Sequence, residues 1–276
     1  KRQGLRYLEF FEFRFVKEAL KEREVLLKAM PHISWPMRFI LPLDESQRFE
    51  ISTPASKLLN NIFPFYKNRR PAWLIRAGLL LYDLMGGRAI LPGTSKLDLS
   101  GAVEGKPLKK KYRKAFEYSD CWVEDSRLVV LNAKDAAMLG AKIHVNTKVI
   151  SATRENGLWR VETKNLATNE REVFLSKVLI NAGGPWVSDL LLNVLKVNSS
   201  EKVRLVRGSH IVVSKMWSHE KSYFFQGKDG RIIFAIPYET DFTLIGTTEI
   251  DHLDLNEKPK CTELEKNYLI NFANQY

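Results

Sequence analysis

One short run of the sequence carries residue types that can hold a phosphate group. Residues 178–180 are apolar, and residues 181–186 then read Asn-Ala-Gly-Gly-Pro-Trp. This order predicts a short buried strand, a tight glycine turn and a helix opened by Pro185, because proline is favoured at the first helical position. Glycine lets the backbone approach a ligand closely, and a helix N-terminus offers unpaired N–H groups to an anion. The run therefore indicates either a diphosphate-binding turn or an ordinary turn between a strand and a helix.

Other candidate residues stand where predicted strands begin or end. His210 enters an apolar strand, and its imidazole titrates near neutrality, which suits a general base. Arg231 enters a second strand, and its planar guanidinium matches a phosphate or a carboxylate. Arg6, which can donate hydrogen bonds to an anion, stands next to the phenol of Tyr7. Thr247 follows the glycine that ends another strand. Structural alternatives stay open: His210 is a histidine hydrogen-bonded at a strand end, and Arg231 is an arginine exposed in a turn.

Motifs for other kinds of chemistry do not occur in the sequence. There is no G-x-G-x-x-G, so the first phosphate loop of a dinucleotide fold is not in this chain. There is no P-loop, no Ser-His-Asp order and no spacing typical of metal ligands. Cys121 and Cys261 form no C-x-x-C pair and are interpreted as reduced thiols of an intracellular protein.

Charge and composition narrow the class of protein. The 276 residues carry a net charge of +11, and 45% are hydrophobic, which is typical of a globular protein with a core. A basic protein suits an anionic small substrate, an anionic membrane surface or nucleic acid. We expect no nucleic acid, because the basic residues are spread out and no nucleic-acid motif occurs. No signal peptide stands at the start, and no apolar stretch reaches the roughly 18 residues of a spanning helix.

Periodicity and turn residues predict the elements that position these candidates. Helices are expected over 9–30, 70–84, 125–139 and 185–195, and strands over 37–41, 142–149, 209–213, 222–225, 231–236 and 242–245. Asn156-Gly157 predicts a β-hairpin between two apolar segments. The helix over 70–84, which contains Trp73, either packs in a core or lies at a membrane surface. An antiparallel block after an α/β block predicts two lobes.

Several separated motifs, taken together, resemble the bacterial FAD-dependent glycerol-3-phosphate dehydrogenases, the respiratory enzymes of aerobic glycerol use. The match covers nearly the whole chain in the right order, which makes it specific. The motifs lie at 4–9 (GLRYLE), 18–27 (EALKEREVLL), 36–39 (PMRF), 70–73 (RPAW), 116–123 (FEYSDCWV), 154–159 (RENGLW), 181–186 (NAGGPW), 208–213 (GSHIVV) and 245–248 (IGTT).

This resemblance implies a fold and a reaction. The fold is α/β plus antiparallel β, a two-lobed FAD-dependent oxidoreductase type that is incomplete in this chain. Residues 1–30 and 126–195 are assigned to the FAD-binding lobe, and residues 31–125 and 196–276 to the substrate lobe. The expected reaction oxidises sn-glycerol 3-phosphate to dihydroxyacetone phosphate. A hydride passes from C2 to flavin N5, and the electrons then pass to ubiquinone at the cytoplasmic face of the membrane.

The same resemblance implies roles for individual residues. His210, Arg6 and Tyr7 are expected at the substrate, with His210 as the base or hydrogen-bond partner of the C2 hydroxyl. Arg231 and Thr247 are expected to bind substrate. The expected FAD-binding positions are Val149, Ala182, Gly183, Gly184 and Trp186.

The resemblance also implies partners for the protein, and the sequence differs from the family at several places. A peripheral place on the inner face of the cell membrane is implied, and a homodimer is compatible with the resemblance. The family's N-terminal glycine-rich loop is missing, and Arg2-Gln3-Gly4 stands where the family has His-Gly-Gly. The segment 43–70 is longer than in the family, and further phosphate-binding arginines would lie beyond Tyr276. The chain is therefore expected to be a piece of a longer protein. The alternative is a non-catalytic remnant or a membrane-associated module of the same fold.

Overall fold

The computed structural model describes residues 11–44, 71–86, 90–199, 203–227 and 230–276, and the separate positions 54, 57, 58 and 61. The chain divides into two compact units. Unit 1 comprises Lys1–Leu128, Gly208–Thr248 and Cys261–Tyr276, and unit 2 comprises Val129–Arg207 and Glu249–Lys260. The described residues 11–30 belong to unit 1, although the sequence assigned them to the FAD-binding lobe. This division reflects packing and does not test which lobe binds a cofactor.

Unit 1 is built on a seven-stranded sheet among its described residues, in the order β2-β3-β1-β9-β10-β11-β8. Neighbouring strands are antiparallel, except β1 and β9, which are parallel. The strands are β1 (Ser34–Pro42), β2 (Ser95–Asp98), β3 (Lys114–Val123), β8 (His210–Ser214), β9 (Ser222–Gln226), β10 (Ile232–Tyr238) and β11 (Phe242–Gly246). The β1–β9 pair therefore joins two segments that are far apart in the sequence.

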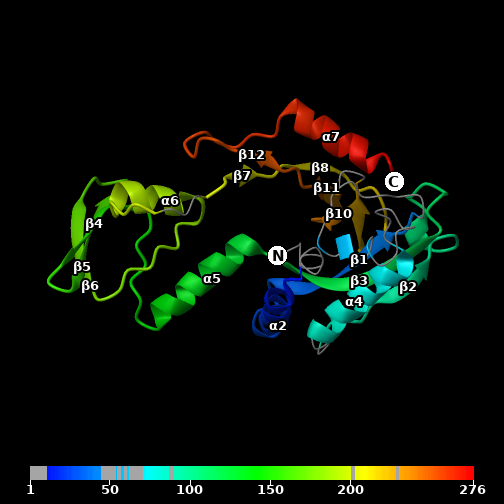
Figure 1. The fold of residues 1–276 in the computed structure, drawn as a ribbon, viewed down its shortest axis with the longest axis horizontal. Coiled ribbons are helices and arrows are strands. Elements are labelled where there is room, and N and C mark those ends of the chain that lie inside the picture. Colours follow the sequence, from blue (N-terminus) through cyan, green and yellow to red (C-terminus); the bar gives the residue numbers. More distant parts are fainter. Residues whose placement is uncertain are drawn as a thin grey trace. The chain divides into compact units, whose positions relative to one another are not determined.

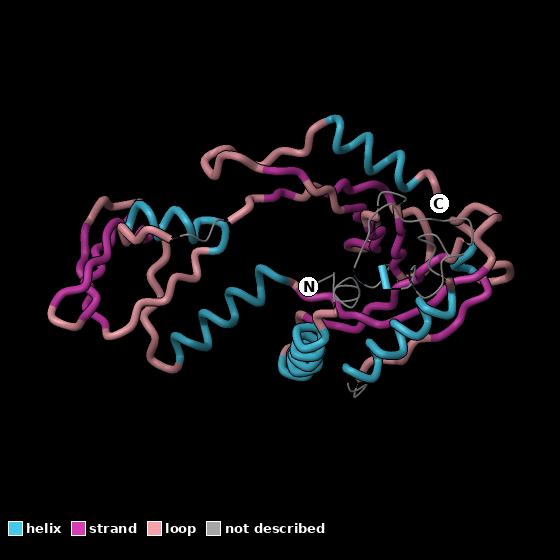
Figure 2. Tube along the Cα trace, in the orientation of Figure 1, coloured by secondary structure: helices cyan, strands magenta, loops and turns pink. Residues whose placement is uncertain are grey.

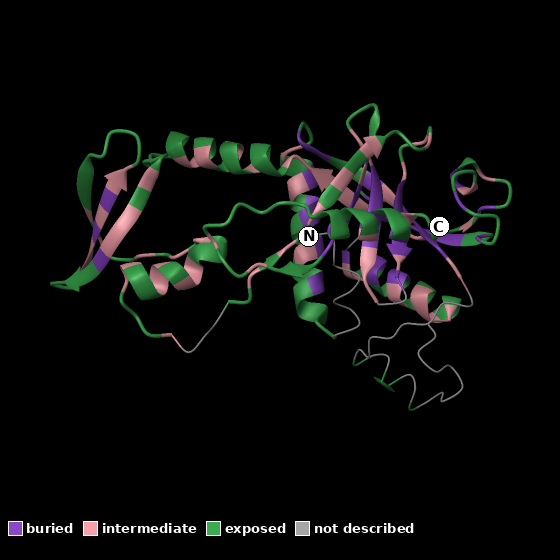
Figure 3. Ribbon diagram, turned by 90° about the horizontal axis from the view of Figure 1, so that it is seen from above, coloured by how far each residue is buried: buried purple, intermediate pink, exposed green. Residues whose placement is uncertain are grey.

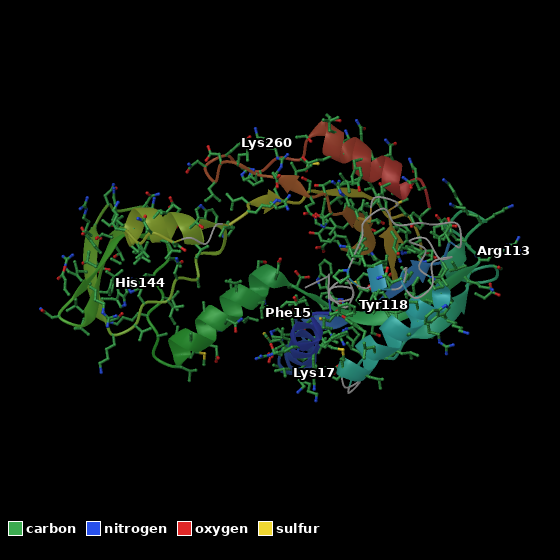
Figure 4. The ribbon with its side chains drawn as sticks, viewed as in Figure 1. Phe15, Lys17, Arg113, Tyr118, His144 and Lys260 are labelled. Atoms are coloured by element: carbon green, nitrogen blue, oxygen red, sulfur yellow. The ribbon has the colours of Figure 1, made fainter. Side chains whose placement is uncertain are left out.

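Helices cover both faces of this sheet. Helices α2 (Phe13–Ala29) and α4 (Ala72–Gly86) lie on one face and α7 (Glu263–Ala273) on the other (Figure 1). On the first face, Val16 and Leu20 of α2 and Leu79 of α4 pack against aromatic residues of the strands. Tyr118 of β3, labelled in Figure 4, belongs to this layer. Its ring stacks on Phe39 with 5.4 Å between centroids.

The second face of the sheet is closed by α7. Leu269 and Phe272 of α7 are buried against Tyr223, Ile233 and Ile245 of the strands. A short 3₁₀ turn, η3 (Val103–Gly105), lies in the connection between β2 and β3. The two layers together give unit 1 a core on each side of its sheet.

Unit 2 contains a three-stranded antiparallel meander of β4 (Thr147–Glu155), β5 (Leu158–Asn165) and β6 (Arg171–Ser176) (Figure 2). The β4–β5 turn has Asn156 at φ 48° and Gly157 at φ 79°, the left-handed pair that a two-residue hairpin requires. The predicted hairpin is confirmed. A two-stranded ribbon joins β7 (Val206–Arg207) to β12 (Ile250–Asp251), and α5 (Asp125–Met138) begins in unit 1 and continues into unit 2.

Unit 2 buries little of its apolar surface. Among its described residues, Ala152, Val161 and Thr163 are the buried ones, and α5 has none (Figure 3). The predicted strand over 178–180 does not form, and Val178 and Ile180 are 70% and 81% exposed. No neighbouring strand of the described chain pairs with this run, so nothing supplies the hydrogen bonds and apolar contacts that would make it a buried strand.

Several other predicted bounds need correction. The helix expected over 185–195 is three short pieces, η4 (Gly184–Trp186), α6 (Val187–Asp189) and the π-helix η5 (Leu190–Val194). The strand expected over 142–149 begins only at Thr147. The strand expected over 37–41 extends at both ends. Pro42 is its last residue, and Pro36 lies where β1 pairs with β3 alone, because β9 pairs only with Phe39 and Ile40; a proline is tolerated at such an edge. Helices α2, α4 and α5 and strands β8 to β11 match the predicted elements closely.

Candidate functional site

Three of the predicted site residues lie at one end of the sheet of unit 1. His210 is the first residue of β8, and it pairs directly with Gly246, the last residue of β11. Gly246 in turn pairs with Phe234 of β10, and Arg231 stands three residues before Phe234. The strand register thus places His210, Thr247 and Arg231 at the same sheet end, although they come from three different strand boundaries.

The imidazole of His210 lies against the backbone of Gly246. A Cβ atom built on Gly246 would be 2.2 Å from Cδ2 and 2.5 Å from Cγ of His210. No real side chain tolerates such a contact, so glycine at position 246 is what allows the ring to occupy this place. His210 is exposed while its neighbour Ile211 packs toward α7, so the imidazole is open to solvent on the opposite face of the sheet.

Arg231 is on the other face. Residues of β10 alternate between faces, and Arg231 shares its parity with Ile233, which packs against α7. Its guanidinium carbon lies 5.3 Å from the centroid of the Tyr268 ring on α7. A cation–π contact of this kind is worth about 0.5–1 kcal/mol at an exposed site. The structure therefore brings Arg231 to the sheet end that carries His210, but not to the same side of the sheet.

Thr247 packs against Gly208 in unit 1. Its Oγ1 donates a hydrogen bond of 3.0 Å to the carbonyl oxygen of Thr248. A Cβ atom on Gly208 would be 2.3 Å from Thr247 Oγ1, so the glycine before Ser209 allows the two segments to approach closely. Both glycines at this sheet end, 208 and 246, are thus required by close packing of a polar side chain.

A carboxylate that sequence reasoning missed lies beneath this sheet end. Glu265 of α7 is 3% exposed and accepts hydrogen bonds from Ser209 Oγ at 2.9 Å and Thr248 Oγ1 at 2.8 Å. Burial disfavours its charge, but hydrogen bonds from the Thr262 N–H and from the hydroxyls of Thr248, Ser209 and Thr262 outweigh burial and lower the pKa of Glu265 to about 2. The spacing Thr262-x-x-Glu265 is a capping-box pattern that could have predicted the start of α7.

The glycine turn lies in unit 2. Asn181 Oδ1 accepts the Gly183 N–H at 3.1 Å, and Asn181 Nδ2 donates to the Val187 carbonyl at 3.1 Å, so the asparagine side chain holds the turn. A Cβ atom on Gly183 would be 2.5 Å from Leu190 Cδ1. Gly184 has φ +55°, and a Cβ there would meet nothing within 4 Å. The turn therefore requires glycine and leaves open space beside Gly184.

The remaining predicted cofactor positions are also in unit 2. Trp186 ends η4 and is exposed, and Ala182 directly precedes Gly183. Val149 is partly buried at the register shift of the β4–β5 ladder. The open space at Gly184 and the exposed surface around it fit the close approach of a diphosphate group. They would supply only part of such a site, since the sequence lacks the first phosphate loop.

A separate pocket of about 380 Å³ lies in unit 1, at the end of β10 remote from Arg231. Its walls combine aromatic rings and carboxylates, and none of the predicted site residues lines it. Its polar and aromatic lining residues are Trp35, Trp122, Glu124, Glu220, Ser222, Tyr238 and Glu239. Arg6 and Tyr7, predicted at the substrate, lie outside the described residues.

Comparison with known proteins agrees with the sequence motifs. A family model described as FAD dependent oxidoreductase matches residues 2–276. D-erythritol 1-phosphate dehydrogenase of Brucella abortus is 50% identical over 273 residues, which cover 99% of this chain and 50% of that protein. Aerobic glycerol-3-phosphate dehydrogenase of Escherichia coli is 41% identical over 273 residues, again 99% of this chain and 50% of that protein. The chain thus spans about half the length of these relatives.

Solved structures support the fold. The glycerol-3-phosphate dehydrogenase of Bacillus halodurans, solved in complex with FAD, superimposes with a TM-score of 0.63 at 24% identity, over 92% of this chain and 42% of that one. Glycine oxidase of Geobacillus kaustophilus gives a TM-score of 0.53 at 15% identity, over 97% of this chain and 60% of that one. Within the described ranges, no helix is both long enough and apolar enough to cross a bilayer.

Proposed function

The chain belongs to the FAD dependent oxidoreductase family, and from this premise we propose that the complete protein oxidises the secondary hydroxyl of a small polyol phosphate. The names of two relatives, 50% and 41% identical over 99% of this chain, support this substrate class. D-Erythritol 1-phosphate and glycerol 3-phosphate share a phosphate ester and a neighbouring secondary alcohol. Bound FAD supplies the hydride acceptor that such an oxidation needs.

The observation that carries the proposal is the position of His210. Its imidazole is exposed at the end of β8 and lies against Gly246, which limits the directions it can take. An imidazole held in this way can accept the proton of a substrate hydroxyl while the carbon–hydrogen bond breaks. We propose that His210 accepts the proton from the hydroxyl oxygen of the substrate. Thr247 at the same sheet end, together with Arg6 and Tyr7, is proposed to contact the rest of the substrate.

The cofactor-facing residues of this proposal are in unit 2. Ala182, Gly183, Gly184 and Trp186 would hold one side of FAD, because the turn is open at Gly184 and requires glycine at position 183. Val149, on β4, is proposed to lie beside the adenine. No step of the reaction depends on these residues, which bind and orient the group.

Steady-state oxidation by the complete, FAD-loaded protein tests the substrate class. The assay uses an artificial electron acceptor with sn-glycerol 3-phosphate, D-erythritol 1-phosphate and their unphosphorylated alcohols. We expect kcat/KM to be at least about 100-fold higher for one phosphate ester than for its alcohol, because an arginine–phosphate contact is charge-assisted and bidentate. Flavin-loaded protein that oxidises neither ester would support the non-catalytic alternative.

Electron transfer to ubiquinone at the inner face of the membrane is part of the same proposal. The net charge of +11 favours an anionic lipid surface, and α4 carries exposed Trp73, Leu80 and Leu84. Replacing the artificial acceptor by a short-chain ubiquinone in the same assay tests the acceptor. The proposal expects turnover with the quinone, and it is contradicted if only the artificial acceptor is reduced.

A further inference from the structure

We propose that Glu265 is a positioning residue for His210, acting from the opposite face of the sheet. This rests on the function proposed for His210. Glu265 is a buried carboxylate on α7, and both of its oxygens are used. One oxygen holds the start of its own helix, and the other holds the two strand ends that place the imidazole.

The helix-capping half of the interaction is local. Glu265 Oε2 accepts the Thr262 N–H at 3.0 Å and the Thr262 hydroxyl at 2.9 Å, and Thr262 Oγ1 accepts the Glu265 N–H at 3.3 Å. This is a capping box, which fixes the first turn of a helix. The capping box explains why a glutamate stands at this position, but it uses only Oε2 and not Oε1.

The second half reaches the sheet. Glu265 Oε1 accepts from Ser209 Oγ, directly before His210, and from Thr248 Oγ1, two residues after Gly246. Thr248 Oγ1 also accepts the Ser209 N–H at 2.8 Å, and the Thr248 N–H donates to the Ser209 carbonyl at 3.2 Å. The carboxylate therefore closes a ring of hydrogen bonds around the two segments that bear His210 and Gly246.

The geometry of the sheet relates this ring to the imidazole. Successive residues of a strand point to opposite faces, so Ser209 points toward α7 while His210 points away from it. Helix α7 is itself fixed by Leu269 and Phe272, which are buried in the second core layer. Because α7 is held in the core, the hydrogen bond from the Ser209 hydroxyl to Glu265 also fixes the position of the Ser209 backbone. His210 takes its place from that backbone and from the contact with Gly246.

The carboxylate remains ionised in this buried place, because the hydrogen bonds that it accepts lower its pKa despite burial. Charge-assisted hydrogen bonds are roughly twice as strong as neutral ones. Removing the carboxylate would leave the hydroxyls of Ser209 and Thr248 without this acceptor, and both strand ends would lose their common anchor. Misplacement of a reacting group by about 1 Å can cost about 100-fold in rate.

Two single substitutions separate positioning from folding. Ser209→Ala removes one hydrogen bond on the sheet side of Glu265. Thr262→Ala removes the hydroxyl hydrogen bonds of the capping box on the helix side and keeps the one from the backbone N–H of residue 262. In the complete, FAD-loaded protein we expect Ser209→Ala to lower kcat by about 10-fold with little change in KM. Thr262→Ala should lower the melting temperature, as loss of a cap does, and keep kcat within about 2-fold. Glu265→Ala should show both effects.

A spectroscopic measurement keeps the test independent of the substrate. The ¹³Cε1–Hε1 resonance of His210 in histidine-labelled protein, identified by its loss in His210→Gln, reports the imidazole environment. We expect it to shift or broaden in Ser209→Ala and Glu265→Gln and to stay in place in Thr262→Ala and in Glu263→Gln, which changes an exposed carboxylate of the same helix.

Identical kcat values and unchanged resonances in Ser209→Ala and Glu265→Gln would overturn the positioning role. Lack of turnover in the wild-type protein, with the resonance still responding to Ser209→Ala, would contradict only the proposed reaction. The two failures are therefore distinguishable.

Discussion

The ring of His210 lies so close to the backbone of Gly246 that residue 246 has no room for a Cβ atom. The two residues are directly paired across β8 and β11, so the contact follows from the register of the sheet and not from a flexible loop. A glycine in the last position of a strand therefore decides where the imidazole can lie. This relationship makes the geometry of His210 sensitive to a change that removes no functional group.

Gly246→Ala is expected to displace the His210 ring and lower kcat by about 10-fold or more, because the added methyl would lie 2.2 Å from Cδ2. Overpacking of this kind also costs about 1–3 kcal/mol of unfolding free energy. Gly101→Ala is the matched control, since a Cβ there meets nothing within 4 Å. Steady-state kinetics and thermal melts of both variants check this, and equal kcat values would show that the contact is not functional.

His210→Ala is expected to lower kcat far more than Arg231→Ala. Loss of a positioned base typically costs about 10²–10⁴-fold. Arg231 points to the α7 side of the sheet and stacks on Tyr268, so its removal should act on KM or on stability instead. Kinetic constants of the two variants, measured beside their melting temperatures, decide between the roles. Turnover of His210→Ala within a few-fold of the wild type would place the base elsewhere.

The stability that Glu265 contributes should vanish in acid. Its pKa falls from 4.5 to about 2 on folding, so the unfolded chain binds a proton at higher pH than the folded one. The contribution is complete above about pH 5 and is lost as the pH falls from 4.5 toward 2, and its size is about 3 kcal/mol. Unfolding free energies of the wild type and Glu265→Gln, measured from pH 6 to 3, should converge toward low pH. A constant difference would mean that the carboxylate charge is irrelevant.

The sequence predicted the elements whose causes are local. The hairpin at Asn156-Gly157 follows from two residues that accept positive φ, and α2 follows from the spacing of Val16, Leu20 and Leu27. The element that covers each face of a sheet depends on segments that are distant in the sequence. Arg231 was predicted at the substrate from its own neighbourhood, where no residue shows that it contacts Tyr268 of α7, a helix that begins about 30 residues later in the sequence. Its role in binding substrate stays a prediction.

Composition alone also does not show whether an apolar segment finds the neighbours that would bury it. The apolar run at 178–180 has the composition of a buried strand, but a strand forms only where another strand pairs with it. In the described chain the run forms no strand, and Val178 and Ile180 are exposed, as are most residues of α5. The same reasoning explains why the role of Glu265 escaped prediction: a capping box can be read from Thr262 and Glu265, whereas its second oxygen meets residues that are distant in the sequence.

The chain of 276 residues by itself is expected not to retain FAD. The turn at Gly183 and Gly184 would supply only one part of the proposed diphosphate site, and the sequence has no G-x-G-x-x-G. Exposed Val178 and Ile180 should also make unit 2 bind a hydrophobic dye. Absorbance of the purified chain measures the first expectation, and dye fluorescence measures the second. Stoichiometric flavin bands would contradict the prediction, and the complete protein serves as the positive control.

Helix α4 presents apolar side chains and an arginine to solvent. In α4, Trp73 and Leu80 are 52% and 40% exposed, and Arg76 is exposed on the same helix. An amphipathic helix of this kind can bury its apolar side chains in the interface while arginine stays at the headgroups. Purely electrostatic attraction of a +11 chain would disappear at 1 M salt, where the screening length is about 3 Å.

We therefore expect binding to anionic vesicles that weakens with salt but persists, with Trp73 and Leu80 contributing the salt-resistant part. The experiment compares the wild type with Trp73→Ala/Leu80→Ala by sedimentation with vesicles at low and high salt. Val129→Ala/Val130→Ala, which changes exposed apolar residues of α5, is the matched control and should bind as the wild type does. Should the α4 variant also bind as the wild type at both salt concentrations, this helix does not contact lipid, and any membrane contact is made through another surface.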